Sequence, residues 1–276
     1  MIKVLITGAT GFVGRQILNS FSGEEVNLLP VVRLGKEDSV SSLPNVERTI
    51  SSPDIFKETE SWWAEQCRDI DVVIHAAWYT EPGKYLQSEL NMICMVGSLN
   101  LARGAAIAGV KRFIGIGTCF EYDLDSGVLS VETPIKPLTP YAGAKAALYL
   151  SLSQWLPTQA VQLAWCRLFY LFGDGEDDRR FVPYLRKKLE NGEMAELTSG
   201  TQIRDFLDVR EAGRKIASVA LGTQIGPINI CSGIPITVRQ FAEKIADEYG
   251  RRDLLDFGKR ADNLIDPTCV IGIPNI

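Results

Sequence analysis

The sequence predicts an α/β protein built on a doubly wound parallel sheet, with a small C-terminal lobe. Apolar runs of strand length alternate with helix-periodic stretches through the first two thirds of the 276 residues. These runs are continuously apolar, which is typical of parallel strands covered by helices on both faces. The pattern loosens after about residue 170. We therefore expect a main domain over residues 1–170 and a smaller lobe over residues 171–276, some segments of which return to the sheet.

The expected elements of the main domain follow in order along the chain. Short apolar runs predict strands. They lie at Lys3–Thr7, Val26–Val32, Val46–Ile50, Val72–Ala76, Arg112–Ile116 and Val161–Leu168. Apolar residues at helical spacing predict the helices between them. They lie at Phe12–Phe21, Lys57–Cys67, Leu86–Ala108 and Tyr141–Trp155. This alternation is what predicts the parallel sheet.

The region after residue 170 predicts a smaller lobe laid against the main domain. Helical periodicity is present at Phe181–Glu190, Arg210–Leu221 and Val238–Tyr249, and a short strand is expected at Ile228–Cys231. The tail from Asp256 shows little helical or strand periodicity. Neither repeats nor low-complexity tracts divide the sequence further.

Composition argues against several classes of protein. The net charge of -5 favours neither nucleic acid nor an anionic membrane as a partner. We expect no signal peptide, and no apolar run of transmembrane length. The six cysteines show no CxxC or metal-ligand spacing, so reduced thiols in a cytoplasmic protein are expected. The single histidine, His75, lies in an apolar run, and we interpret it as a hydrogen-bonded core residue rather than a metal ligand or a triad base.

A glycine-rich turn joins the first predicted strand to the first helix. It reads Gly8-Ala9-Thr10-Gly11-Phe12-Val13-Gly14. One glycine allows the tight turn, the next lets the backbone approach a pyrophosphate, and the third lets the helix pack on the strand. Free N–H groups and the positive end of the helix dipole then face the phosphates. This context predicts Rossmann-type dinucleotide binding, and the alternative is a glycine-rich turn that binds no ligand.

The end of the second strand predicts which dinucleotide is bound. An acidic residue at this place binds the ribose 2′-hydroxyl of NAD. This sequence instead has Arg33 there, and its first acid is Glu37. Arg33 can bind a 2′-phosphate, with Arg15 and Lys36 nearby, so NADP is favoured and NAD is the alternative. The other interpretation is that Arg33 and Arg15 are solvated surface charges.

Three polar residues have spacing that suits proton transfer. Tyr141 and Lys145 are four residues apart and share one face of a predicted helix. A phenol has an unperturbed pKa of about 10, and a nearby ammonium favours its anion. We therefore expect Lys145 to lower the Tyr141 pKa toward neutrality. Thr118 lies upstream, two residues after the predicted strand Arg112–Ile116.

With these residues in place, the chain resembles an extended short-chain dehydrogenase/reductase of the NAD-dependent epimerase/dehydratase type over nearly its whole length. The resemblance rests on several motifs at the family's spacing. They are the glycine turn, Asp71–Ala77, Gly97–Leu101, Gly117–Thr118, Tyr141 with Lys145, Arg204–Val209, and Asn229–Gly233 followed by Thr237–Val238. Several ordered motifs are a far stronger signal than any one of them.

The resemblance implies three groups of site residues. The catalytic residues are Thr118, Tyr141 and Lys145. The cofactor-binding residues are Gly8, Thr10, Gly11, Phe12, Val13, Gly14, Arg15, Arg33, Ala76, Ala77, Trp78, Tyr141 and Lys145. The substrate-binding residues are Phe120, Glu121 and Arg204, with Arg204 on the diphosphate of a nucleotide-sugar. For Arg204 the alternative is an ion pair with Asp205 or Asp208. For Phe120, Tyr122 and Trp78 the alternative is core packing.

The sequence departs from the family pattern at three places, and the first of them bears on the activity. The 4,6-dehydratases of this type carry Asp-Glu directly after the catalytic Thr, where this chain has Cys119-Phe120, which argues against a 4,6-dehydratase. Cys94 stands where many members have Asn, and Asn91 lies one helical turn earlier. The usual Tyr-Gly-Pro reads Phe172-Gly173-Asp174.

Three functions follow as hypotheses. The first is a reductase that uses NADP to convert a nucleotide-linked 4-keto-6-deoxy sugar to the 4-hydroxy product, or the reverse. The second is a nucleotide-sugar epimerase that retains NAD and returns the hydride to the other face. The third is a non-catalytic NADP(H)-sensing regulator, against which the intact Thr118, Tyr141 and Lys145 argue.

The resemblance also implies a homodimer. The long predicted helices would pair across a two-fold axis. The apolar seam would consist of Met92, Met95, Leu99, Leu148 and Leu152. The alternative is that both helices only cover the sheet.

Overall fold

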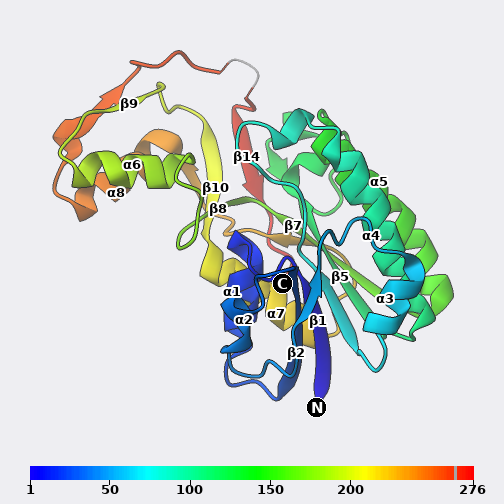
Figure 1. Ribbon diagram of the computed structural model, residues 1–276. Coiled ribbons are helices and arrows are strands. Elements are labelled where there is room, and N and C mark those ends of the chain that lie inside the picture. The colour runs from blue at the N-terminus through cyan, green and yellow to red at the C-terminus, as the bar shows by residue number, and fades with distance from the viewer. Residues whose placement is uncertain (264–265) are drawn as a thin grey trace.

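The computed structural model describes residues 1–263 and 266–276, and within them the largest sheet has seven strands in the order β11-β7-β5-β4-β1-β2-β3 (Figure 1). The strands are β1 (Ile2–Thr7), β2 (Val26–Arg33), β3 (Ile50–Ser52), β4 (Val72–His75), β5 (Arg112–Thr118), β7 (Gln162–Leu168) and β11 (Gly226–Ile230). Every neighbouring pair is parallel. The order of winding reverses beside β1, and ligands bind at the carboxyl ends of strands next to such a reversal.

Helices cover both faces of this sheet, as a doubly wound fold requires (Figure 1). One face carries α1 (Phe12–Ser20) and α7 (Val209–Leu221), and the other carries α3 (Glu60–Gln66), α4 (Leu90–Ile107) and α5 (Pro140–Trp155). Successive side chains of β1 point to opposite faces of the sheet, so both faces are apolar and both need a helical cover. Val4 and Ile6 pack into the first layer and Leu5 into the second. The predicted fold class is confirmed.

The second lobe has its own small core. It contains α6 (Phe181–Glu190), α8 (Val238–Glu248) and the paired strands β9 (Ala195–Leu197) and β13 (Leu255–Phe257). Their apolar side chains form a separate cluster that includes Leu185 and Phe241. In Figure 1 this lobe stands apart from the main sheet, beyond β8 and β10.

A second sheet connects the lobe to the main domain. Its path is β12 (Pro235–Thr237), β10 (Ile203–Asp208), β14 (Cys269–Gly272) and β6 (Val128–Leu129), and β8 (Tyr170–Phe172) also pairs with β10. After β10 the chain returns to the main sheet through α7 and β11. Residues 209–230 therefore belong spatially with the first part of the chain.

The predicted and the observed secondary structure differ mainly in the short elements. The strand expected at Val46–Ile50 begins only at Ile50, because Asn45 adopts a left-handed φ of 67° and Val46 makes a single bridge to Leu28. The four-residue helix α2 (Asp38–Ser41) and the strands of the connecting sheet have no clear periodicity in the sequence. Strands of two to four residues are set by distant partners, which local pattern does not record.

Helix α4 corrects the expectation that no apolar run reaches transmembrane length. By length and composition alone it could cross a membrane, with a mean hydropathy of 1.3 over 18 residues. However, 44% of that stretch is buried within the protein, where Leu101, Ala102 and Ala105 pack against the sheet layer. A core helix passes the same test of length and hydropathy, so this finding is weak evidence for a membrane span.

Candidate active site

Gly8 and Gly14, at the two ends of the turn after β1, lie where a Cβ would collide with the backbone. Gly8 has a φ of +71°, and a Cβ on it would lie 2.6 Å from the Ala77 nitrogen. A Cβ on Gly14 would lie 2.1 Å from the Gly8 oxygen. The Gly11 N–H closes the turn on the Gly8 carbonyl at 2.9 Å. Helix α1 is therefore pressed against the ends of β1 and β4, where Ala76 and Ala77 follow β4.

The N-terminus of α1 fits a pyrophosphate. Its N-cap is Gly11, which has no side chain to accept the first helical N–H groups. The first turn of the helix, which includes Phe12 and Val13, carries no acidic residue that would repel an anion. Thr10 is half-buried beside this turn, and Arg15 is exposed just beyond it. The expected cofactor-binding residues of the turn thus lie together around an uncapped helix end.

Arg33 lies at the exposed end of β2, opposite Ser52 of β3. Its neighbour Lys36 is also exposed. The first acid after the strand, Glu37, is held by backbone amides and by the Ser51 side chain, which lower the pKa of its carboxyl. The strand end therefore presents a cation, as the sequence predicts.

The structure brings Thr118, Tyr141 and Lys145 together. Thr118 ends β5, while Tyr141 lies in the first turn of α5, which Thr139 caps by accepting the Ala142 N–H at 3.2 Å. The Thr118 side chain is close enough to the Tyr141 phenol to act on its pKa. One turn further on, the Lys145 ammonium donates to the Ile116 carbonyl at 2.6 Å. The carboxyl end of β5 and the start of α5 thus converge on one point.

The pKa values of this group differ from the sequence prediction. Burial raises the Tyr141 pKa above its ordinary value, Tyr85 and Glu121 raise it further, and the Thr118 hydrogen bond opposes them. Lys145 does not lower it toward neutrality as predicted, because its ammonium is directed at the Ile116 carbonyl. Burial lowers the pKa of Lys145 to about 7, against the opposing effects of Glu121 and Cys94. The phenol is therefore held in its protonated form.

An aromatic wall surrounds Tyr141. The Lys145 nitrogen lies 3.8 Å above the centre of the Trp78 ring. Tyr85, in the short 3₁₀ helix η1 (Tyr85–Gln87), meets the Tyr141 ring edge-on at 4.8 Å. Asn91 holds both neighbours, because it accepts the Trp78 indole N–H at 2.8 Å and donates to the Tyr85 carbonyl at 2.6 Å. Sequence reasoning missed Tyr85 and left the role of Asn91 open.

Arg204 is buried beside the same site. Only 4% of it is exposed, and its guanidinium lies 5.1 Å from the centre of the Tyr170 ring, which also meets Phe120 at 6.1 Å. Asp205 is occupied by the N–H groups of residues 232, 233 and 272. Asp208 caps α7 and pairs with an arginine on that helix. The alternative of an ion pair between Arg204 and either aspartate therefore does not describe this structure.

Glu121 is a correction. We expected its carboxylate to face a substrate, but none of the residue is exposed. The carboxylate accepts the Thr118 N–H at 2.9 Å and the Trp165 indole N–H at 3.0 Å, and pairs with Arg167 at 2.7 Å. The segment from Thr118 turns as a 3₁₀ helix, which directs the Glu121 side chain back beneath the strand. Phe120 remains half-buried beside the site.

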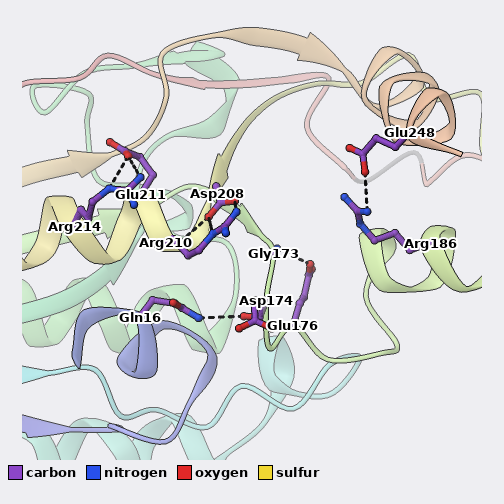
Figure 2. A network of polar contacts seen from close by, with 10 residues as sticks. All are labelled: Gln16, Gly173, Asp174, Glu176, Arg186, Asp208, Arg210, Glu211, Arg214 and Glu248. Atoms are coloured by element: carbon purple, nitrogen blue, oxygen red, sulfur yellow. Dashed lines mark hydrogen bonds and ion pairs between the residues drawn. The ribbon is translucent and has the colours of Figure 1, made fainter. Parts of the chain in front are cut away.

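The loop after β8 lies over the start of α1 (Figure 2). Gln16 donates to the Asp174 carbonyl at 3.4 Å, and a Cβ on Gly175 would lie 4.0 Å from the Phe12 ring. The same loop leads to Arg180, whose positive charge is close enough to the Tyr85 hydroxyl to lower its pKa against the effect of burial. It therefore joins the second lobe to both the glycine turn and the aromatic wall.

A protein-family model described as the NAD dependent epimerase/dehydratase family matches residues 4–230. The chain belongs to this family. It is an enzyme of the extended short-chain dehydrogenase/reductase type, which argues against the non-catalytic sensor. The cofactor class of the family is the nicotinamide dinucleotide, and the glycine turn and uncapped α1 fit its pyrophosphate.

Relatives and solved structures of this family resemble the chain over most of its length. A dTDP-6-deoxy-L-talose 4-dehydrogenase (NAD(+)) from Aggregatibacter actinomycetemcomitans is 25% identical over 250 residues, which is 90% of this chain and 91% of the relative. A dTDP-glucose 4,6-dehydratase from Streptomyces niveus is 24% identical over 269 residues, covering 90% of this chain and 78% of its own. A UDP-N-acetylglucosamine 4-epimerase from Methanobrevibacter ruminantium M1 shares the fold, with a TM-score of 0.87, 22% identity and coverage of 99% of this chain and 90% of its own.

Proposed function

We propose that this epimerase/dehydratase is a reductase that converts the 4-keto group of a nucleotide-linked 4-keto-6-deoxyhexose to a hydroxyl, or runs the reverse reaction. The observation that carries the proposal is the convergence of Thr118, Tyr141 and Lys145, with no acid directly after Thr118. Cys119 occupies that place, and burial raises its thiol pKa above the ordinary value. Neither Cys119 nor the aromatic Phe120 supplies the acid that would expel water in a 4,6-dehydratase.

Tyr141 supplies the proton in the proposed reaction. Because burial raises its pKa, the phenol is protonated at neutral pH and can donate to a carbonyl oxygen as that oxygen gains charge. Thr118 donates a second hydrogen bond to the same oxygen. Lys145, near Trp78, would hold the nicotinamide ribose. When bound, the reduced dinucleotide supplies the hydride.

Two arginines lie near the place where the substrate is proposed to bind. Arg204 is buried, and its guanidinium donates a hydrogen bond to the carbonyl of its own neighbour, Ile203, at 2.9 Å. Arg180 reaches Tyr85, beside Tyr141, from the second lobe. Guanidinium groups bind phosphate through paired N–H donors, so Arg204 is proposed to hold the diphosphate of a nucleotide-sugar. The names of both curated relatives include a dTDP-linked sugar, which supports this class of substrate.

The relative from Aggregatibacter also supports the position of reaction. Its name describes dehydrogenation at C4 of a 6-deoxy sugar, which is the reverse of the reduction proposed here. The second candidate is a nucleotide-sugar epimerase that retains NAD. A fold shared with a 4-epimerase at a TM-score of 0.87 favours that candidate.

Cofactor exchange distinguishes the two candidates. A reductase must release its dinucleotide in each cycle, whereas an epimerase gains by keeping it. The purified protein should contain little dinucleotide and should consume NADPH in proportion to product when given a dTDP-linked 4-keto-6-deoxyhexose. Mass spectrometry of the purified protein and the absorbance of reduced nicotinamide measure both. Tightly bound NAD(H), with turnover and no net absorbance change, would support the epimerase instead.

Arg33 is proposed to select NADP through the 2′-phosphate. Arg33→Ala should weaken NADPH binding by about 1.5–3 kcal/mol, the value of a charge-assisted hydrogen bond, and leave NADH binding nearly unchanged. Titration calorimetry with both dinucleotides measures the difference, and Arg48→Ala is a matched control because Arg48 is an exposed cation further along the chain. An equal loss for both dinucleotides, or a wild-type preference for NADH, would contradict this role.

We also propose a homodimer formed through α4 and α5. The seam differs from the predicted one, because Leu148 and Leu152 are core residues with 1% exposed. The exposed apolar side chains of the two helices are Leu90, Met92, Ile93, Val96, Ile107 and Leu150. Burying such a patch against a second copy would remove apolar area from water. Sedimentation at micromolar concentration should give a species of twice 30.5 kDa, shifted toward monomer by Val96→Glu. A wild-type monomer would contradict the dimer.

A further inference from the structure

A buried ion pair lies directly beneath the proposed catalytic threonine. The Arg167 Nε and a Glu121 carboxylate oxygen are 2.7 Å apart, and the two residues are 1% and 0% exposed. The other carboxylate oxygen of Glu121 accepts the Thr118 N–H at 2.9 Å. The pair thus links the end of β5 to the end of the neighbouring strand β7.

The Glu121 carboxylate and the Trp165 indole fit beneath β5 because residue 117 has no side chain. A Cβ on Gly117 would lie 2.5 Å from the Glu121 carboxylate and 2.2 Å from the Trp165 indole nitrogen. Glycine at this position therefore admits the carboxylate under the strand. The indole N–H of Trp165 donates to both carboxylate oxygens, at 3.0 and 3.1 Å. Three donors from two strands fix one side chain.

The Arg167 guanidinium is packed against two aromatic rings. Its guanidinium carbon lies 4.4 and 4.6 Å from the centres of the Tyr122 and Tyr149 rings. It also donates to the Tyr122 hydroxyl at 2.9 Å, and that hydroxyl donates to Asn229 at 2.8 Å. A buried ion pair is weak evidence for stability, because desolvation of the two charges offsets their attraction. Its location suggests a role in the site.

Glu121 and Lys145 both bind the end of β5. The Glu121 carboxylate accepts the Thr118 N–H at 2.9 Å, and the Lys145 ammonium donates to the Ile116 carbonyl, two residues earlier, at 2.6 Å. Burial lowers the Lys145 pKa to about 7, while Glu121 is the larger of the two groups that raise it and Cys94 is the other. His75, on β4, is also near enough to interact with the ammonium. Without the carboxylate, one of the two effects that oppose desolvation is lost, so the Lys145 pKa should fall further.

We propose that Glu121, held by Arg167, is a positioning residue that fixes the Thr118 backbone and places a negative charge beside the strand end that the Lys145 ammonium binds. The assignment rests on the proposed function, because that function gives Thr118 and Lys145 their roles. It accounts for an acid placed where a carboxylate facing the sugar was expected. Glu121 acts through its neighbours and does not touch the substrate.

Two variants separate the two roles. Glu121→Gln removes the charge but keeps an oxygen that can accept the Thr118 N–H. Glu121→Asp keeps the charge but is one methylene too short to reach that N–H. Glu121→Gln with Arg167→Met removes both charges and leaves no unpaired ion, so it serves if the single variants fail to fold. Arg112→Met is the matched control, because Arg112 is a buried arginine at the opposite end of β5, bound to the Val219 carbonyl at 2.9 Å.

The first measurement needs neither substrate nor cofactor. Lysine labelled with ¹³C at Cε is titrated by NMR, with the Lys145 signal assigned by its loss in Lys145→Met. Glu121→Gln, alone or with Arg167→Met, should lower the Lys145 midpoint by about one pH unit or more. Glu121→Asp and Arg112→Met should leave it nearly unchanged. An unchanged midpoint in the Gln variants would overturn the electrostatic role, whatever reaction the enzyme catalyses.

The second measurement is steady-state kinetics on the wild-type substrate. Glu121→Asp should lower kcat by about 10- to 100-fold with little change in KM, because Thr118 loses the group that orients it. Arg112→Met should keep kcat near the wild-type value at a temperature where it is folded. Equal kcat for Glu121→Asp and the wild type would overturn the positioning role. If the wild type shows no turnover of the 4-keto sugar, the proposed function fails while the NMR result still decides the electrostatic role.

Discussion

Tyr141→Phe should lower turnover by roughly 10²–10⁴-fold while leaving dinucleotide affinity nearly unchanged. The phenol is the proposed proton donor, and phenylalanine keeps the ring that packs edge-on against Tyr85 at 4.8 Å. Only the hydroxyl and its interaction with the Thr118 side chain are lost. Stopped-flow measurement of hydride transfer, with dinucleotide affinity measured separately, tests this directly.

Tyr85→Phe is the matched control for this experiment. It removes a second hydroxyl within the same aromatic wall, one that lies near Arg180. Its effect on turnover should be far smaller than that of Tyr141→Phe. Lys145→Ala should impair both turnover and dinucleotide binding, because Lys145 is proposed to contact the cofactor. Near wild-type turnover in Tyr141→Phe would show that another group transfers the proton.

Local sequence signals predicted the part of the site that lies on regular elements. The glycine turn directly follows an apolar strand, so its place at the end of β1 follows from chain order. Tyr141 and Lys145 share a helix face because they are one turn apart. The strand predicted at Arg112–Ile116 is present as β5, which extends two residues further and ends at Thr118. Strand ends and helix faces are properties of ten or fewer consecutive residues, which a pattern can record.

The rest of the site depends on side-chain directions that no local pattern records. Whether Glu121 faces the substrate or the core depends on the 3₁₀ turn after Thr118 and on Arg167, 46 residues further on. Tyr85 reaches Tyr141 because Asn91 binds its carbonyl from the next helix. The apolar residues Leu148 and Met92 look alike in the sequence, yet only the first is buried. Such distinctions arise from tertiary packing.

His75 lies in the core, as predicted. Its burial underlies the second prediction, which concerns how the free energy of unfolding depends on pH. Its two ring nitrogens lie 2.7 Å from the Thr7 hydroxyl and 2.6 Å from the Ser98 hydroxyl, and the residue is 2% exposed. Burial lowers the His75 pKa to about 3, and the nearby Lys145 ammonium lowers it in the same direction. The folded protein therefore keeps this imidazole neutral in mild acid.

This depressed pKa makes stability depend on pH in a defined window. Above about pH 6.5 the imidazole is neutral in both the folded and the unfolded chain, so the full stability is present. As the pH falls from about 6.5 toward 3, the unfolded chain takes up a proton that the folded chain does not. The free energy of unfolding should therefore fall by about 5 kcal/mol across this window, at about 1.4 kcal/mol for each pH unit.

His75→Gln should remove most of this acid sensitivity. Glutamine can still reach the Ser98 hydroxyl but does not titrate, so the variant should be less stable than the wild type at pH 7 and lose less stability on acidification. Urea denaturation at pH 7, 5 and 4 measures both slopes. Carboxylates that titrate in the same range are present in both proteins, so the difference between the slopes isolates His75. Parallel slopes would mean that His75 takes up a proton in the folded state as readily as in the unfolded chain, and that its burial does not control acid stability.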